Sequence, residues 1–382
     1  MRTFVCGVTP KQRGRLAAHL CAGSRYNFVM LRRIELGGFL LLYVAIAAAS
    51  MISLAGNFAP AAAGKGTAGG TGPPQIEREI QATGRVFPEI GPGVNALKRD
   101  LAGLYYILAA PASVISVYGA DAKRLSPIPN ANSKGAKIVY AEDLDVDASG
   151  RLFVADRGAN AIKVFKPDGT LDATIPASAA TSIVALPGGE LAVGTQRSDR
   201  LVDIIDAQGK VVRSFGDPAE LAGRAAANRF LSRGRLMGDS AGYIYFAFTY
   251  SPDPTIRKYD RYGYSSYEIS LSTAEFNPEA EKRHDVLRLD RHIDVPTSKP
   301  VINAIGVDPA TQEVWAAIGN ALLHFSKDGS RLPTFRTVTK DGARIEPKAI
   351  LVEADRLLLA ADPLGIFEFA RPDKNLVSSP NP

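Results

Sequence analysis

Cysteine is scarce in this chain of 382 residues: there are two, Cys6 and Cys21, and both lie near the N-terminus. The rest of the sequence therefore has neither a disulfide framework nor a thiolate metal site. A cysteine-free body suits an oxidising compartment, although it does not require one.

An excess of positive charge is also missing from most of the chain. The formal net charge of +6 arises in residues 1–60, which carry seven of the 45 Lys and Arg residues but only one of the 39 Asp and Glu residues. The remainder has 38 basic and 38 acidic residues and is neutral. A nucleic-acid-binding surface needs clustered, uncompensated Lys and Arg, so the composition predicts no nucleic-acid partner.

Local catalytic signatures are lacking as well. The sequence contains no Gly-rich phosphate loop, Gly-x-Ser-x-Gly elbow, Cys-x-x-Cys pair or His-Glu-x-x-His helix. Their absence weakens hydrolase and kinase hypotheses, and we predict no cofactor. Enzymes that gather residues from distant repeats are not excluded, because they leave no local trace.

One long apolar run is present, from Gly37 to Ala55, and it follows Arg32 and Arg33. A charged start and an apolar core are typical of a secretory signal, and roughly 20 apolar residues can also span a bilayer. Residues 30–55 are therefore predicted to be a signal peptide or a membrane-anchor helix, and in either case the rest of the chain is exported. We expect a periplasmic or secreted protein whose only membrane contact is this segment.

Two further segments complete the N-terminal organisation. Residues 1–29 are interpreted as a mis-started or cytoplasmic extension, because Met30-Leu31-Arg32-Arg33 would make a normal start for the signal. Residues 56–83 are interpreted as a linker, since their first part is rich in Ala, Gly and Pro and cannot bury a core. Residues 84–382 remain for the folded domain.

The folded region repeats one pattern. Its clearest copy, residues 143–175, reads as four short strands separated by turns. Gly150 and Gly169 can adopt a positive φ in these turns, and Asp147 and Asp168 can accept hydrogen bonds from the backbone just ahead. Apolar residues alternate between the turns, which is typical of strands. The same frame recurs over residues 94–128, 183–215, 236–269, 302–335 and 349–377.

Six such units predict an all-β fold, a six-bladed β-propeller of four-stranded antiparallel blades, preceded by the signal or anchor helix and the linker. A single four-stranded sheet cannot cover its own faces, whereas radial stacking shields them all. Residues 94–97 are expected to supply the first inner strand, and residues 375–377 an outer strand of the last blade. Two closures stay open: the blades meet end to end, or residues 84–90 add a clasp strand to the last blade.

The blade that reads VDASGRLFVADRGANAIKVFKPDG, residues 146–169, resembles the NHL repeat. The resemblance extends over roughly residues 94–377; it is good at 183–215 and 302–335 and loose elsewhere. It implies a propeller but brings no catalytic motif, because NHL propellers serve as enzymes, ligand binders and protein-docking platforms.

Two long connections are the first candidate for a site, because long loops in compact folds are often functional. Residues 217–234 are predicted to be helical, and residues 272–300 are rich in charge. The candidate residues in them are Arg229, His284, Arg288 and His292. A metal could in principle be bound by His284, Asp285, Asp290 and His292. The spacing of the two histidines matches no known ligand pattern, and the segment also suits a solvated charged loop.

A polar ring at the mouth of the central channel is the second candidate. Aligning the repeats puts five residues at equivalent positions where the inner strands begin, with Asp143 beside the first: Glu142, Thr181, Arg235, Asn303 and Lys348. Such a ring suits a peptide or small-molecule site, and it is also typical of any water-filled channel mouth. Asp156 lies in a turn on the same face and is interpreted as a turn former.

These features predict a non-catalytic, extracytoplasmic platform that binds a protein, peptide or glycan through the channel mouth. The alternative is a metal-dependent enzyme resembling the lactonase or peptidyl-lyase propellers. In that case Glu142 or Asp143, together with Asn303, would hold one divalent ion that activates a water. The ligand pattern of those enzymes is not matched, because no third partner is evident in the sequence.

Overall fold

The computed structural model describes residues 78–110, 112–131, 133–196, 199–220, 225–271 and 299–372. The predicted signal or anchor at residues 30–55 lies outside these ranges, as do His284, Arg288 and His292. Within the described ranges, no helix has the length and apolar character needed to cross a membrane.

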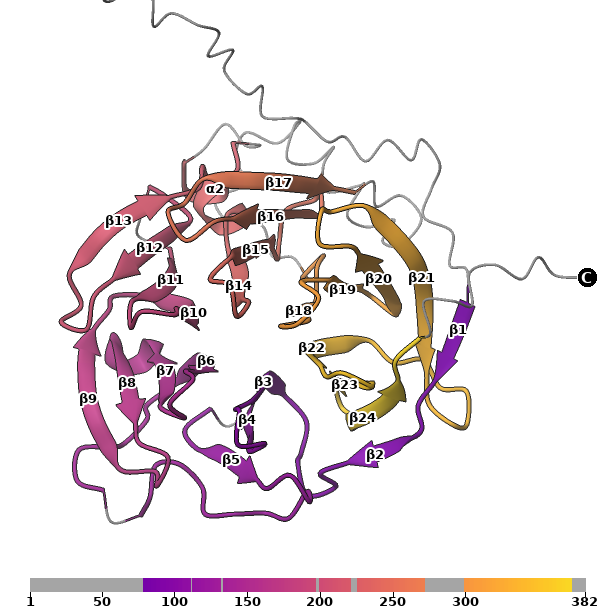
Figure 1. The fold of residues 1–382 in the computed structure, drawn as a ribbon, viewed down its shortest axis with the longest axis horizontal. Helices are drawn as coiled ribbons and strands as arrows, with labels where there is room; N and C mark the ends of the chain where they lie inside the picture. Colours follow the sequence, from indigo (N-terminus) through magenta and orange to yellow (C-terminus); the bar gives the residue numbers. More distant parts are fainter. Residues whose placement is uncertain are drawn as a thin grey trace, which may run out of the picture. The chain divides into compact units, whose positions relative to one another are not determined.

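The described residues form six sheets arranged around a central axis (Figure 1). The first sheet contains β3 (Val94–Arg99), β4 (Tyr105–Ala109) and β5 (Ile115–Tyr118). The second contains β6 (Ala141–Val146), β7 (Leu152–Asp156), β8 (Ala161–Phe165) and β9 (Leu171–Pro176). The third contains β10 (Ala180–Ala185), β11 (Leu191–Thr195), β12 (Val202–Ile205) and β13 (Val211–Phe215).

The other three sheets repeat this order. The fourth contains β14 (Gly234–Gly238), β15 (Ile244–Phe248), β16 (Thr255–Tyr259) and β17 (Ser265–Ser270). The fifth contains β18 (Ala304–Val307), β19 (Val314–Ile318), β20 (Ala321–Phe325) and β21 (Arg331–Val338). The sixth contains β22 (Pro347–Val352), β23 (Arg356–Ala361) and β24 (Gly365–Ala370).

The first strand of every sheet lies innermost, and each inner strand contacts the next around the ring, with β22 returning to β3 (Figure 1). The predicted six-bladed β-propeller is therefore confirmed. The first blade departs from four strands: residues Arg124 and Ile128 form only isolated bridges with β5 where a fourth strand would lie.

Aspartate shapes the turns between strands. In the second blade the Asp147 carboxylate accepts hydrogen bonds from the backbone N–H groups of Ser149 and Arg151, both at 2.9 Å, and Gly150 has a φ of 79°. The same two contacts recur at Asp206, Asp239 and Asp260. A short carboxylate satisfies donors that no strand can reach, so each turn is formed by its own sequence.

The hydrophobic core lies between neighbouring blades. Every residue of β7, β8, β15 and β19 is buried, as expected for strands that are covered on both faces. One cluster joins Tyr106 and Leu108 of the first blade to Leu144 and Val154 of the second. Because each core layer is shared, no blade covers its own surface.

The N-terminal strands close the ring. β2 (Gly84–Val86) pairs antiparallel with β24 as the outer strand of the last blade, and β1 (Arg78–Gln81) pairs in parallel with β21 of the fifth blade. Of the two predicted closures, the structure therefore shows the one in which an N-terminal clasp strand is added to the last blade. The outer strand predicted at residues 375–377 lies outside the described residues, and β2 takes the place beside β24. β1 lies within residues 56–83, the segment interpreted as a linker, and it is ordered there because it pairs with β21.

Candidate functional site

Four of the six inner strands contain an extra residue at the end nearest the channel mouth. Pairing with the second strand shifts register around Asn95, Glu142, Thr181 and Lys348, so each is the additional residue of a β-bulge. A bulge leaves one residue outside the ladder, and the bulges thus bring equivalent residues of four blades to one rim. Sequence reasoning did not identify Asn95 as a rim residue, although counting back five positions from the turn residue Asp100 would have found it.

Arg235 does not belong to this rim. β14 has no bulge, so Arg235 pairs with Ala247 as Asp143 pairs with Ala155. Gly234 takes the rim position instead, and Arg235 lies one layer deeper. The repeat alignment misplaced Arg235 by one residue: Arg235 lies four positions before the turn residue Asp239, whereas the rim residues of the neighbouring blades lie five positions before theirs.

Arg235 spans the channel. Its Nη1 donates to the backbone carbonyl of Asn95 at 2.7 Å. Asn95 lies on β3 of the first blade and Arg235 on β14 of the fourth, which is the opposite wall of a six-bladed ring (Figure 1). Deeper in the channel, Lys98 Nζ lies 3.7 Å from the sulfur of Met237, again joining the first and fourth blades.

The charges in the channel form one network. Lys98 forms an ion pair with Asp145 at 2.9 Å. Asp143 accepts hydrogen bonds from the hydroxyl of Ser182 and from the N–H groups of Ile183 and Leu144. Burial raises the pKa of Asp143, although Lys98 and Arg235 oppose it. Burial lowers the pKa of Lys98, but Asp145 and Asp143 outweigh it and the net shift is upward.

Little free space remains in the channel. A cavity of about 20 Å³ lies among residues of five inner strands: Asn95, Ala96, Leu97, Lys98, Asp143, Arg235, Leu236, Met237, Ile305, Lys348, Ala349 and Ile350. One water needs at least about 10–15 Å³, so the cavity holds one or two waters. A peptide or glycan therefore cannot thread the channel and can reach only its mouth.

The remaining rim residues have partners within the protein. Glu142 pairs with Arg157 at 2.5 Å, and the Thr181 hydroxyl donates to the carbonyl of Gly194 at 3.0 Å. The Asn303 amide, in the orientation that satisfies both its polar atoms, donates to the carbonyl of Val301 at 3.2 Å and accepts from Lys348 Nζ at 3.0 Å.

The metal ligands that the enzyme alternative would use are thus bonded to protein groups. Glu142 is neutralised by Arg157, and Asp143 is turned toward β10. Across the described ranges, no group of three or more His, Cys, Asp or Glu side chains is arranged to hold a metal ion. No observation among these residues favours metal chemistry.

The connection before the fourth blade contains a shorter helix than predicted. Of residues 217–234, the described part is helical only over α2 (Ala225–Leu231). Ala227 and Leu231 are buried, while Arg229 is exposed. Phe230 of this helix forms an aromatic pair with Tyr250, which follows β15, with ring centroids 4.7 Å apart.

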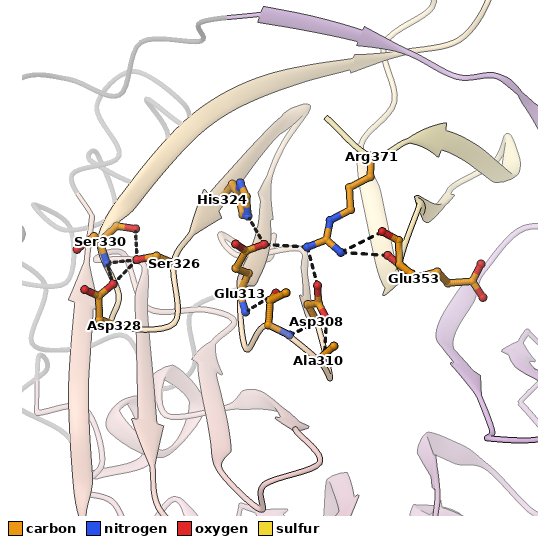
Figure 2. Close-up of polar contacts among 11 residues, drawn as sticks. Asp308, Ala310, Glu313, His324, Ser326, Asp328, Ser330, Glu353 and Arg371 are labelled. Carbon is orange, nitrogen blue, oxygen red and sulfur yellow. Dashed lines mark hydrogen bonds and ion pairs between the residues drawn. The ribbon is translucent and has the colours of Figure 1, made fainter. Parts of the chain in front are cut away.

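A second charged cluster lies at the turns on the opposite face (Figure 2). Arg371, just after β24, reaches Asp308 at 2.5 Å and Glu313 at 2.8 Å, both in the fifth blade, and donates to the carbonyl of Glu353 at 3.2 Å. His324 lies 3.3 Å from Glu313. Burial raises the pKa of Asp308, but donors from Thr311, Ala310 and Arg371 bring it below its usual value.

This cluster stabilises the closure of the ring. Glu353 in the last blade also accepts from the Tyr105 hydroxyl and pairs with Arg99 of the first blade, both at 2.9 Å. The ion pairs therefore connect the fifth, sixth and first blades. Sequence reasoning missed them, and no local signal marks them because the partners come from three blades.

Comparisons with known proteins reveal the architecture only. No family model matches the chain, and no curated protein matches it in sequence. A solved structure described as an exported protein of Bacteroides fragilis has a TM-score of 0.51 at 10% identity, covering 78% of this chain and 95% of the other. The two chains share a fold.

Other solved structures agree less closely. Virginiamycin B lyase from Staphylococcus aureus has a TM-score of 0.43 at 17% identity, covering 77% of this chain and 89% of the lyase. The RRP9 WD40 repeats have a TM-score of 0.49 at 12% identity, covering 76% of this chain and 99% of theirs. At such identities neither an activity nor a partner can be transferred.

Proposed function

We propose that this chain is an extracytoplasmic binding scaffold of the NHL type, which docks a protein, peptide or glycan on the mouth of its channel and performs no chemistry on it. The observation that carries the proposal is the blocked channel. Arg235 and Lys98 cross it, while four bulges and Asn303 bring a polar rim to one face.

The state of the mouth carboxylates argues for binding over catalysis. A general acid or base must reach the proton that it transfers. Asp143, the carboxyl group whose pKa burial raises, is 5% exposed and accepts three hydrogen bonds. Glu142 is held by Arg157. Both carboxylates are therefore held by contacts within the protein, and neither is placed to transfer a proton to or from a ligand.

Two finer parts of the proposal have separate support. The NHL assignment is supported by the pattern of residues 146–169, whose turns form as the repeat requires, with Gly150 and Gly169 at positive φ. Export is supported by the charged and apolar character of residues 30–55.

Peptide and glycan arrays probed with purified protein test the proposal. We expect the wild type to bind a subset of spots, and the double variant Glu142→Gln/Lys348→Met to lose at least tenfold in signal there, since it removes the Lys348 cation and breaks the Glu142–Arg157 ion pair of the rim. The matched control is Lys166→Met/Asp172→Asn, which removes an exposed ion pair of 3.7 Å at a turn on the other face.

Binding that survives the rim variant as well as the control would place the site elsewhere. Mass spectrometry of the bound ligands gives the second readout. A converted ligand would contradict a non-catalytic role.

A further inference from the structure

Positive charge is in excess around the channel cavity. Three cations line it, Lys98, Arg235 and Lys348, against one carboxylate, Asp143. Asp145 adds a second carboxylate through its ion pair with Lys98. Glu142 on the rim does not change the balance, because Arg157 neutralises it. Among the residues of this region that the structure describes, one positive charge therefore remains uncompensated at the mouth.

The excess charge lies at the outer end of the cavity. Lys98 deep in the channel has its own counterion, Asp145. Arg235 is close enough to Asp143 to influence its pKa, yet the hydrogen bond from its Nη1 goes to a neutral carbonyl, that of Asn95. Lys348 likewise donates to a neutral amide oxygen, that of Asn303. Both contacts can be exchanged for a stronger, charged acceptor.

The cavity has the size of a small anionic group. About 20 Å³ accommodates one or two water-sized atoms, which fits the two oxygens of a carboxylate. Apolar side chains form much of the wall, among them Leu97, Leu236, Ile305 and Ile350. Charge interactions are stronger where such walls exclude water.

We infer that the cavity binds the carboxylate of the docked ligand, held between Lys348 at the rim and Arg235 in the wall. The inference rests on the proposed function and adds the chemical class of the group that is recognised. The ligand enters from the mouth, because Lys98 and Met237 close the channel below. The Arg235 fork matches two carboxylate oxygens, and Lys348 adds a point charge.

Thermal unfolding with a simple carboxylate tests the inference. Sodium acetate is compared with sodium chloride at equal ionic strength, so that general screening cancels. We expect acetate to raise the Tm of the wild type by about 2 °C, as binding to the folded state alone requires. The shift should vanish in Lys348→Met and persist in Lys340→Met, a control that removes an exposed lysine from a connection on the same face.

A short peptide with a free C-terminus and its amidated counterpart distinguish the sources of the carboxylate. A shift with the free acid alone indicates a peptide end, whereas a shift with acetate but neither peptide indicates a small free acid; both support a carboxylate site. Equal effects of acetate and chloride, or an acetate shift that remains in Lys348→Met, would overturn it. If the arrays still show rim-dependent binding, the proposed function survives that result.

Discussion

At the scale of single residues, aspartate decides much of the local structure. Asp147, Asp206, Asp239 and Asp260 each accept two backbone hydrogen bonds within their own turn. Asp156 differs, because it is fully buried and binds another segment. Its carboxylate accepts from the N–H groups of Val139 and Tyr140, both at 2.9 Å, in the connection from the first blade.

Asp156→Ala should therefore be strongly destabilising. The substitution leaves three backbone donors without their charged acceptor, those of Val139, Tyr140 and Ala159. We expect a loss of about 3 kcal/mol in the free energy of unfolding, measured by urea denaturation. Asp168→Ala, at an exposed turn, is the control and should cost much less. Equal losses would show that burial of Asp156 contributes little.

At the scale of elements, this chain is distinguished by the places where its strands depart from the regular four-stranded blade. Four inner strands contain a bulge, whereas β14 and β18 do not. Arg235 of β14 takes the ladder position that Asp143 has in β6, and it therefore lies in the channel below the rim. The N-terminal strands β1 and β2 cover the outer edges of the fifth and sixth blades. An uncovered edge would present unpaired backbone groups to another chain.

Deleting residues 78–86 tests the clasp. The edges of β21 and β24 would lose their partners, and the buried Ala82 would be removed. We expect the free energy of unfolding to fall by more than about 2 kcal/mol and the protein to self-associate at high concentration, measured by urea denaturation and sedimentation. A deletion of equal length at residues 61–69 controls for shortening. Unchanged stability would mean that the other strands close the ring alone.

At the scale of the whole molecule, stability comes from the contacts between blades. The inner strands approach so closely that some interfaces accept only glycine. A Cβ added to Gly306 of β18 would lie 2.6 Å from Cγ2 of Ile350 and 3.1 Å from its carbonyl oxygen, on β22. The charged cluster around Arg371 and Glu353 joins the same two blades, the fifth and the sixth, at the face opposite the channel mouth.

Gly306→Val should therefore weaken the ring rather than one blade. We expect a loss of about 2–3 kcal/mol through overpacking, with the unfolding curves from tryptophan fluorescence and circular dichroism shifting together. Gly84→Val is the matched control, since no atom lies within 4 Å of its added Cβ. A split transition would show that the blades unfold independently.

The sequence by itself determined the number of blades, their turns and the first inner strand. These features depend on contacts between residues a few positions apart, such as Asp147 with Ser149 and Arg151. It also predicted Glu142, Thr181 and Lys348 as equivalent positions, which the bulges of β6, β10 and β22 bring to one rim. Whether this rim binds a ligand stays a prediction.

Only the tertiary structure decided what closes the ring and what fills the channel. Arg235 meets the carbonyl of Asn95 from 140 residues away, and Gly84–Val86 pairs with the last strand of the final blade. Turn spacing carries no information about such contacts, because they exist only once six blades have closed around a common axis. The radius of that closure sets which side chains reach across the channel and leaves a cavity of about 20 Å³.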